Sequence, residues 1–123
     1  MLSEFKSQFM ETENMVNEMT EFYLQKVLLI DEEVIYTFQG CGCFSFFTDR
    51  RIIFIQDFMA PTYSDEIEFM PYSTIERYGV VFESDGDGSN VELYIPDVVM
   101  IRFYFSKCED AFNLVEFLGK KTQ

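Results

Sequence analysis

The sequence contains no histidine and no tryptophan among its 123 residues. The absence of histidine removes the commonest general base, the Ser-His and Cys-His nucleophile systems and the commonest metal ligand. Carboxylates could still act in pairs, and Glu66 with Glu68, or Asp85 with Asp87, have a suitable spacing. Solvated strand faces and turns carry the same pattern and explain it better. We therefore expect a protein that is not an enzyme and has no metal site and no cofactor.

Cysteine is scarce, with three residues at positions 41, 43 and 108. Cys41 and Cys43 form a C-x-C pair rather than C-x-x-C, and no histidine is available to complete a zinc site. The odd number argues against a disulfide framework. We interpret the pair as two small apolar residues near the start of a strand.

Long apolar runs are also missing, since none approaches the ~18 residues of a membrane-spanning helix. The first residues, MLSEFKSQFMETEN, are acidic and polar and lack the basic and apolar segments of a secretory signal. These two features predict a cytoplasmic protein.

Basic residues are few, with 9 Lys and Arg against 22 Asp and Glu, which gives a net charge of −13. Such a chain repels nucleic acids and anionic membrane surfaces. It favours neutral or basic protein partners, although solubility alone also explains an acidic composition.

Core-forming residues are abundant: 48% of the chain is hydrophobic and 18% is aromatic, which predicts one folded core. Residues 3–24 predict a helix, because Phe5, Phe9, Val16, Met19 and Tyr23 recur at helical spacing. We therefore divide the chain into an N-terminal amphipathic helix (1–23) and a β-rich domain (24–123). The helix packs either on its own subunit or on another.

The stretch CFSFFTDRRIIFIQDF, residues 43–58, has two apolar runs separated by polar residues. This pattern predicts a strand, a tight turn and a second strand. Thr48 and Asp49 are suited to shape the turn, because their side chains can bond to nearby backbone. Arg51 is expected to start the second strand and to pair with a carboxylate.

Five more strands are predicted around this hairpin, at about 34–38, 66–70, 72–84, 91–95 and 98–105. The segment DGDGSN, 85–90, is predicted to be a turn, because its spacing fails that of a calcium loop. Residues 106–121 predict a helix with a capping box at Ser106 and Glu109 and a stop at Gly119. Its apolar stripe consists of Ala111, Phe112, Val115 and Leu118. The fold class is mainly β: a seven-stranded, strongly bent sheet or partly open barrel, capped by the C-terminal helix.

Three motifs in this order resemble the bacterial pleckstrin-homology-like (PH-like) family of short, single-domain proteins. FFTDRRIIFIQ resembles the family's F-T-[DN]-x-R-[LI]-I hairpin, and VELYI resembles its E-L-x-[LI]-[WI] strand. EFMPYSTIERYGV resembles its [SI]-x-P-Y-x-S-I segment, although Ser73 and Thr74 stand here in place of the x-S pair. The resemblance covers roughly residues 24–119. Glu83 and Ser84 resemble a Glu-Thr pair of the family, but the loop that follows departs from the family pattern.

This resemblance implies a non-catalytic module that forms cyclic homo-oligomers and offers a shared polar surface to other proteins. We place that protein-binding surface at Arg77, Glu83, Ser84 and Glu92, with the partner protein unidentified. Lipid-binding relatives carry basic residues between their first two strands, where this chain has QGCG, which argues against membrane lipid. The alternative function is an acidic one-to-one inhibitor, or immunity-type protein, of a basic partner.

Overall fold

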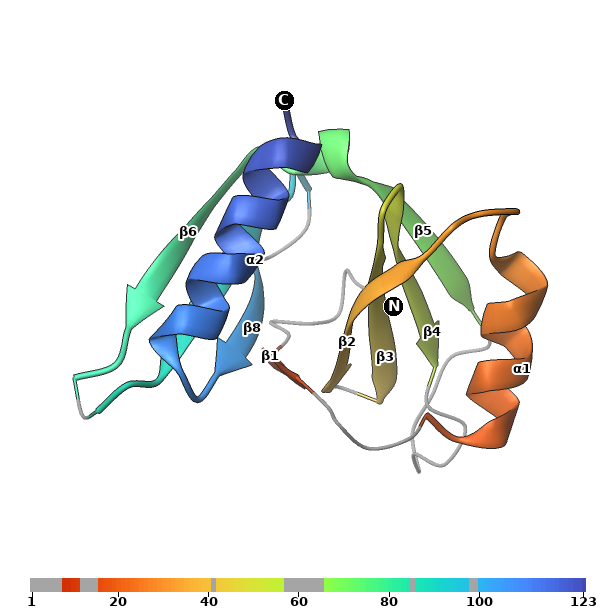
Figure 1. Cartoon of the computed structure of the whole chain (residues 1–123), viewed down its shortest axis with the longest axis horizontal. Helices are drawn as coiled ribbons and strands as arrows, with labels where there is room; N and C mark the ends of the chain where they lie inside the picture. The colour runs from red at the N-terminus through yellow and green to blue at the C-terminus, as the bar shows by residue number, and fades with distance from the viewer. Residues whose placement is uncertain (1–7, 12–15, 41, 57–65, 85, 98–99) are drawn as a thin grey trace.

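The computed structural model describes residues 8–11, 16–40, 42–56, 66–84, 86–97 and 100–123. They form one strongly curled sheet, a half-barrel, in the order β5-β4-β3-β2-β1-β8-β7-β6. Figure 1 shows α1 and α2 at opposite ends of the molecule, each beside a different half of the sheet. In the described part of the chain, no helix is long and apolar enough to cross a membrane.

Two antiparallel meanders make up the halves of this sheet. The first contains β2 (Val34–Gly40), β3 (Cys43–Thr48), β4 (Arg51–Gln56) and β5 (Ile67–Pro71). The second contains β6 (Arg77–Phe82), β7 (Ser89–Tyr94) and β8 (Ile101–Phe105). The mainly β, strongly bent fold expected from the sequence is thereby confirmed, and β5 and β6 are its two edge strands.

The N-terminal region differs from the expected helix over residues 3–24. Gln8–Glu11 form β1, which pairs antiparallel with β2 and parallel with β8 and so joins the two meanders. Phe9 is fully buried and stacks on Phe103 with 5.2 Å between ring centroids. The helical spacing of its aromatic residues misled the prediction, because tertiary hydrogen bonds to two strands override local periodicity.

The helix of this region, α1, is shorter and covers Glu18–Val27. Asn17 is its N-cap and accepts a hydrogen bond from the Thr20 N–H at 3.0 Å. The expected boundary between residues 23 and 24 falls inside α1, and Phe5 lies outside the described residues. The division of the chain into two domains stays a prediction.

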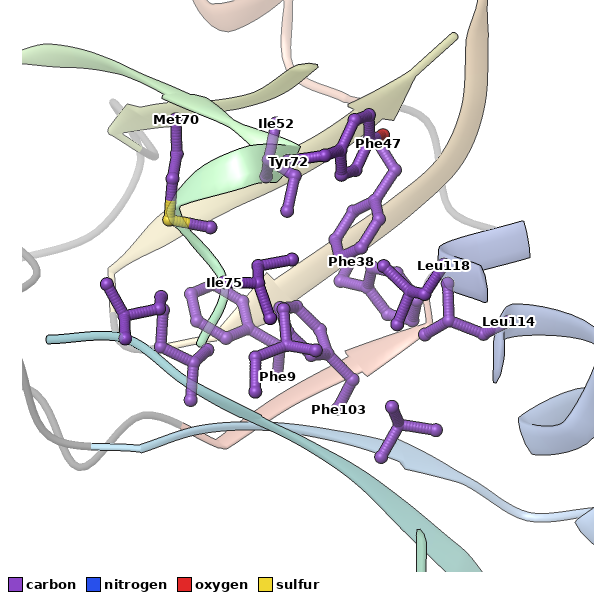
Figure 2. Packing of buried hydrophobic residues seen from close by; sticks show 14 of the residues in the cluster. Phe9, Phe38, Phe47, Ile52, Met70, Tyr72, Ile75, Phe103, Leu114 and Leu118 are labelled. Carbon is purple, nitrogen blue, oxygen red and sulfur yellow. The ribbon is translucent and has the colours of Figure 1, made fainter. Parts of the chain in front are cut away.

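The main core fills the concave face of the sheet beneath α2 (Cys108–Lys121). Figure 2 shows Phe9, Phe38, Phe103 and the α2 residues Leu114 and Leu118 in this core. Complete burial of a Phe or Leu side chain contributes roughly 1.5–3 kcal/mol each to folding. Many of the phenylalanines among the described residues are thus buried inside the protein.

Helix α2 ends at Lys121, as the predicted range 106–121 has it, but the chemistry predicted for its two ends is wrong. Its N-cap is Lys107, without a side-chain capping bond, so Ser106 and Glu109 do not form the expected capping box. The helix continues through Gly119 to Lys121, because packing of Leu118 on the core holds its last turn. Phe112, expected on the buried stripe, is 49% exposed.

A smaller core lies on the convex face, where α1 covers β3 and β4. Its buried members come from one helix and two strands: Leu24, Phe44, Phe46, Ile53 and Ile55. The Thr20 hydroxyl also donates to the Gln56 carbonyl at 3.0 Å, which ties α1 to the end of β4. Both faces of β3 and β4 are therefore buried, which explains their nearly continuous apolar sequences.

The seven predicted strands are all present, and β1 is the eighth. The predicted strand 72–84 divides into a single 3₁₀ turn, η2 (Tyr72–Thr74), and β6. Tyr72 is buried and its hydroxyl donates to the Thr48 carbonyl at 2.5 Å, which holds the chain at this corner.

Candidate functional site

Strand alternation divides β6, β7 and β8 into an inner and an outer face. Tyr78, Val91, Leu93, Ile101 and Phe103 pack into the main core from the inner face. The strand register aligns the outward-facing residues of the three strands. Arg77 is paired with Tyr94, and Gly79 is paired with Glu92, which is paired in turn with Arg102. We call Arg77, Tyr94, Glu92 and Arg102 the outer-face chain.

Each member of the outer-face chain contacts the next, from Arg102 through Glu92 and Tyr94 to Arg77. Arg102 donates to Oε2 of Glu92 from Nε at 3.1 Å and from Nη2 at 2.8 Å. The Tyr94 hydroxyl donates to Oε1 of the same carboxylate at 2.7 Å. The guanidinium carbon of Arg77 lies over the Tyr94 ring, 3.8 Å from its centroid. The four side chains therefore form one continuous arrangement over three strands.

The electrostatics of the outer-face chain differ from those of the whole protein. The Glu92 side chain is only 7% exposed and each of its oxygens accepts a hydrogen bond. Its hydrogen bond with Tyr94 raises the pKa of that phenol. The four side chains of the outer-face chain carry two positive charges and one negative charge, whereas the whole protein has a net charge of −13.

Space is open beside Arg77, because β6 carries a glycine two residues further along. A Cβ placed on Gly79 would meet no heavy atom within 4 Å. The neighbouring outward residue of β6, Val81, is 46% exposed. The outer-face chain therefore borders an accessible strip of the edge strand.

Two of the four residues predicted for the protein-binding surface belong to the outer-face chain, namely Arg77 and Glu92. The other two, Glu83 and Ser84, are exposed beyond the end of β6 and lie outside it. The Glu83 N–H donates to the Gly88 carbonyl at 3.0 Å and so helps to close the hairpin.

The sequence reasoning missed Tyr94 and Arg102. Period-2 alternation from Glu92 would have placed Tyr94 on the same face. Arg102 becomes its neighbour only through the β7–β8 register, which no local sequence pattern provides.

The residues singled out in the β3–β4 hairpin form a second polar cluster. Thr48 Oγ1 accepts from the N–H groups of Arg50 and Arg51, each at 3.0 Å, and donates to Glu32 at 2.7 Å. Asp49 Oδ1 accepts from the Glu33 N–H at 2.9 Å. Arg51 is the first residue of β4, and its partner Glu32 comes from the loop after α1.

Arg51 and Glu32 connect this hairpin to the end of α1. Arg51 Nη2 donates to the Val27 carbonyl at 2.8 Å, and the Leu29 N–H donates to Glu32 at 2.9 Å. Burial raises the pKa of Glu32, but the hydrogen bonds from Arg51, Leu29 and Thr48 outweigh it and lower the pKa to about 2. Both carboxylate oxygens of Glu32 accept hydrogen bonds from the protein, so we interpret this cluster as a structural link.

Of the two carboxylate pairs noted in the sequence, only Glu66 with Glu68 lies wholly within the described residues. Glu66 is exposed and Glu68 is half-buried on edge strand β5, while Asp85 lies outside the described residues. Among the described residues, no group of three or more Cys, Asp or Glu could hold a metal ion. We therefore take the outer-face chain, a polar arrangement on the sheet surface, as the candidate site.

The curled sheet with α2 packed on its concave face defines a PH-like fold. A crystal structure of a DUF1696 family protein with a pleckstrin-homology domain from Shewanella loihica PV-4 has a similar fold, with a TM-score of 0.63. The two sequences are 16% identical, and the match covers 95% of this chain and 97% of the other. The resemblance to bacterial PH-like proteins expected from the sequence is confirmed at the level of the fold.

A second similar structure is a pleckstrin homology domain from Shewanella amazonensis SB2B. Its TM-score is 0.52 at 16% identity, with 91% of each chain covered. No protein-family model and no curated protein matches the sequence.

Proposed function

We propose that this protein is a non-catalytic, cytoplasmic binding and assembly module. Its subunits form a cyclic homo-oligomer that presents a polar surface to another protein. The single observation that carries the proposal is the outer-face chain, an ordered polar arrangement that lies directly beside the edge strand β6.

The two edge strands support assembly. Natural proteins pair, cover or charge the edges of a sheet, because exposed backbone groups invite pairing with other chains. Here the edges carry exposed apolar side chains in addition to Glu68 and Arg77. Phe69 on β5 is 45% exposed, and Val81 and Phe82 on β6 are 46% and 59% exposed. A head-to-tail contact that closes into a ring would cover both edges in every subunit.

An exposed aromatic pair supports the same assembly at the β6 edge. The ring centroids of Phe82 and Phe112 of α2 are 5.9 Å apart, and Phe112 is itself 49% exposed. Contiguous apolar surface of this kind often marks a contact between proteins.

The test is the mass of the purified protein by light scattering behind a sizing column. The proposal expects one species at several times 14.6 kDa. Val81→Lys places a charge on the β6 edge and is expected to shift the protein to monomer. Ile30→Lys is the matched control, because Ile30 is 87% exposed in the α1–β2 turn and belongs to neither edge strand.

A wild-type monomer at all concentrations would contradict the ring. The second candidate, an acidic inhibitor of a basic partner, would then become the better function, because its one-to-one complex needs no assembly. The charge of −13 is the observation that favours this candidate.

A further inference from the structure

Arg77 is held in place although it is exposed. Its guanidinium lies over the Tyr94 ring, and the Tyr94 hydroxyl is fixed by Glu92 at 2.7 Å. Glu92 is buried and is fixed in turn by Arg102 at 2.8 Å. An arginine side chain that is already ordered loses less conformational entropy when it binds a ligand.

The donors of Arg77 are available to a ligand. Its contact with Tyr94 is a cation–π contact, which occupies the face of the guanidinium and leaves its N–H groups at the rim. In the described part of the chain, no carboxylate lies within ion-pair distance of Arg77. Glu92 accepts its hydrogen bonds from Tyr94 and Arg102, and its ion pair is with Arg102.

The complementary group is a carboxylate. The N–H fork of arginine matches a carboxylate in a two-bond geometry, and the positive charge of the guanidinium favours an anion. The open space beside Gly79 leaves room for the carboxylate and its side chain next to the fork.

The net charge of the protein indicates which kind of anionic ligand can approach Arg77. A net charge of −13 repels polyanions such as nucleic acids and anionic membranes. A protein segment with one acidic side chain in neutral or basic surroundings avoids that repulsion. The exposed Val81 next to the site suits an aliphatic neighbour on such a segment.

We propose that Arg77, oriented by Tyr94, Glu92 and Arg102, binds the carboxylate of a single Asp or Glu in an otherwise neutral or basic segment of a partner protein. This proposal rests on the proposed function only in treating the outer-face chain as a protein-binding surface. It requires no ring.

The experiment uses two acetylated and amidated synthetic peptides as probes. The first has the sequence G-S-K-V-E-V-K-S-G, and the second carries Gln in place of its Glu. Each is titrated into the ¹⁵N-labelled full chain while the Arg77 Nε–Hε signal is followed by NMR. Because a charge-assisted hydrogen bond is worth roughly 1.5–3 kcal/mol, the Glu peptide is expected to bind at least about tenfold more tightly.

Two variants distinguish binding of the peptide at Arg77 from a general attraction between opposite charges. Arg77→Gln is expected to remove the difference between the two peptides. Arg50→Gln removes the same charge from an exposed turn residue and is expected to preserve that difference. Both positions are exposed, so both variants should fold, and far-ultraviolet circular dichroism checks this.

Four results would overturn the proposal. They are equal binding of the two peptides, equal losses in both variants, a stronger response to inorganic phosphate or to phosphatidylserine vesicles, and a monomer produced by Arg77→Gln. The last result would show that a second copy of this chain occupies Arg77. If the wild-type protein is a monomer and still prefers the Glu peptide, the ring fails and this proposal stands.

Discussion

Arg51 binds both carboxylate oxygens of Glu32, from Nε at 2.9 Å and from Nη2 at 2.8 Å, where the Glu32 side chain is fully buried. The two residues are nineteen positions apart and connect the start of β4 with the loop after α1. This two-bond geometry is the most specific form of an ion pair between side chains.

Replacing Arg51 with Met should strongly destabilise the protein, because Glu32 would remain buried without its cation. Breaking a buried ion pair in this way costs roughly 3–5 kcal/mol. Urea unfolding measures the change in the free energy of unfolding. Arg50→Met in the same turn is the control and should change it by less than about 0.5 kcal/mol, since Arg50 is exposed and its nearest carboxylate contact is at 4.0 Å. Equal effects of the two variants would contradict the structural role of Arg51.

The same pair should make stability depend on acidity. The pKa of Glu32 falls from its ordinary value of 4.5 to about 2 in the folded protein. A depressed pKa gives a stabilisation that is complete above the unfolded value and is lost as the pH falls toward the folded value. Wild type should therefore lose stability between about pH 4.5 and pH 2, by about 3 kcal/mol from this group.

Glu32→Gln is the reference for that measurement, because it lacks the titrating group and keeps the other carboxylates. The difference in free energy of unfolding between wild type and this variant should shrink as the pH is lowered through that window. A difference that stays constant from pH 6 to pH 2 would show that Glu32 does not have a depressed pKa.

The position of β1 in the sheet predicts very different losses of stability when the adjacent residues Phe9 and Met10 are replaced. Phe9 is fully buried against Phe54 and Phe103, whereas Met10 on the same strand is 54% exposed. Phe9→Ala should cost about 3–5 kcal/mol, and Met10→Ala less than about 1 kcal/mol. Thermal unfolding of the two variants measures both effects. Similar small effects would indicate that residues 8–11 are not part of the sheet.

The hydrogen bond between Tyr94 and Glu92 predicts a change in the titration of the phenol. This bond raises the pKa of Tyr94, so its stabilisation is present below the unfolded value and is lost as the pH rises through the folded value. Glu92→Gln should lower the pKa of Tyr94, because it removes the negative charge near the phenol. NMR of ¹³C-labelled tyrosine rings follows this titration, and an unchanged value in the variant would rule out the contact.

Local patterns predicted most of the β elements correctly. The hairpin around Thr48 and Asp49 was recognisable because turn chemistry and period-2 apolar runs act over a few residues. The same reasoning failed at Phe9, whose helical spacing was coincidental, and at Ser106 and Gly119, where packing of α2 rather than capping sets the helix ends. For the candidate site, Arg77 and Glu92 were identified, whereas Tyr94 and Arg102 were missed.

The sequence by itself determined the class of the fold, the number of strands in the two meanders and the acidic character of the surface. These properties depend on residue type and short-range alternation. Only the tertiary structure decided that Gln8–Glu11 complete the sheet and that Arg51 meets Glu32. It also decided that Arg102 binds the carboxylate of Glu92, which in turn holds Tyr94 next to Arg77. These contacts depend on strand register and on segments far apart in the chain, and no short window of sequence contains that information.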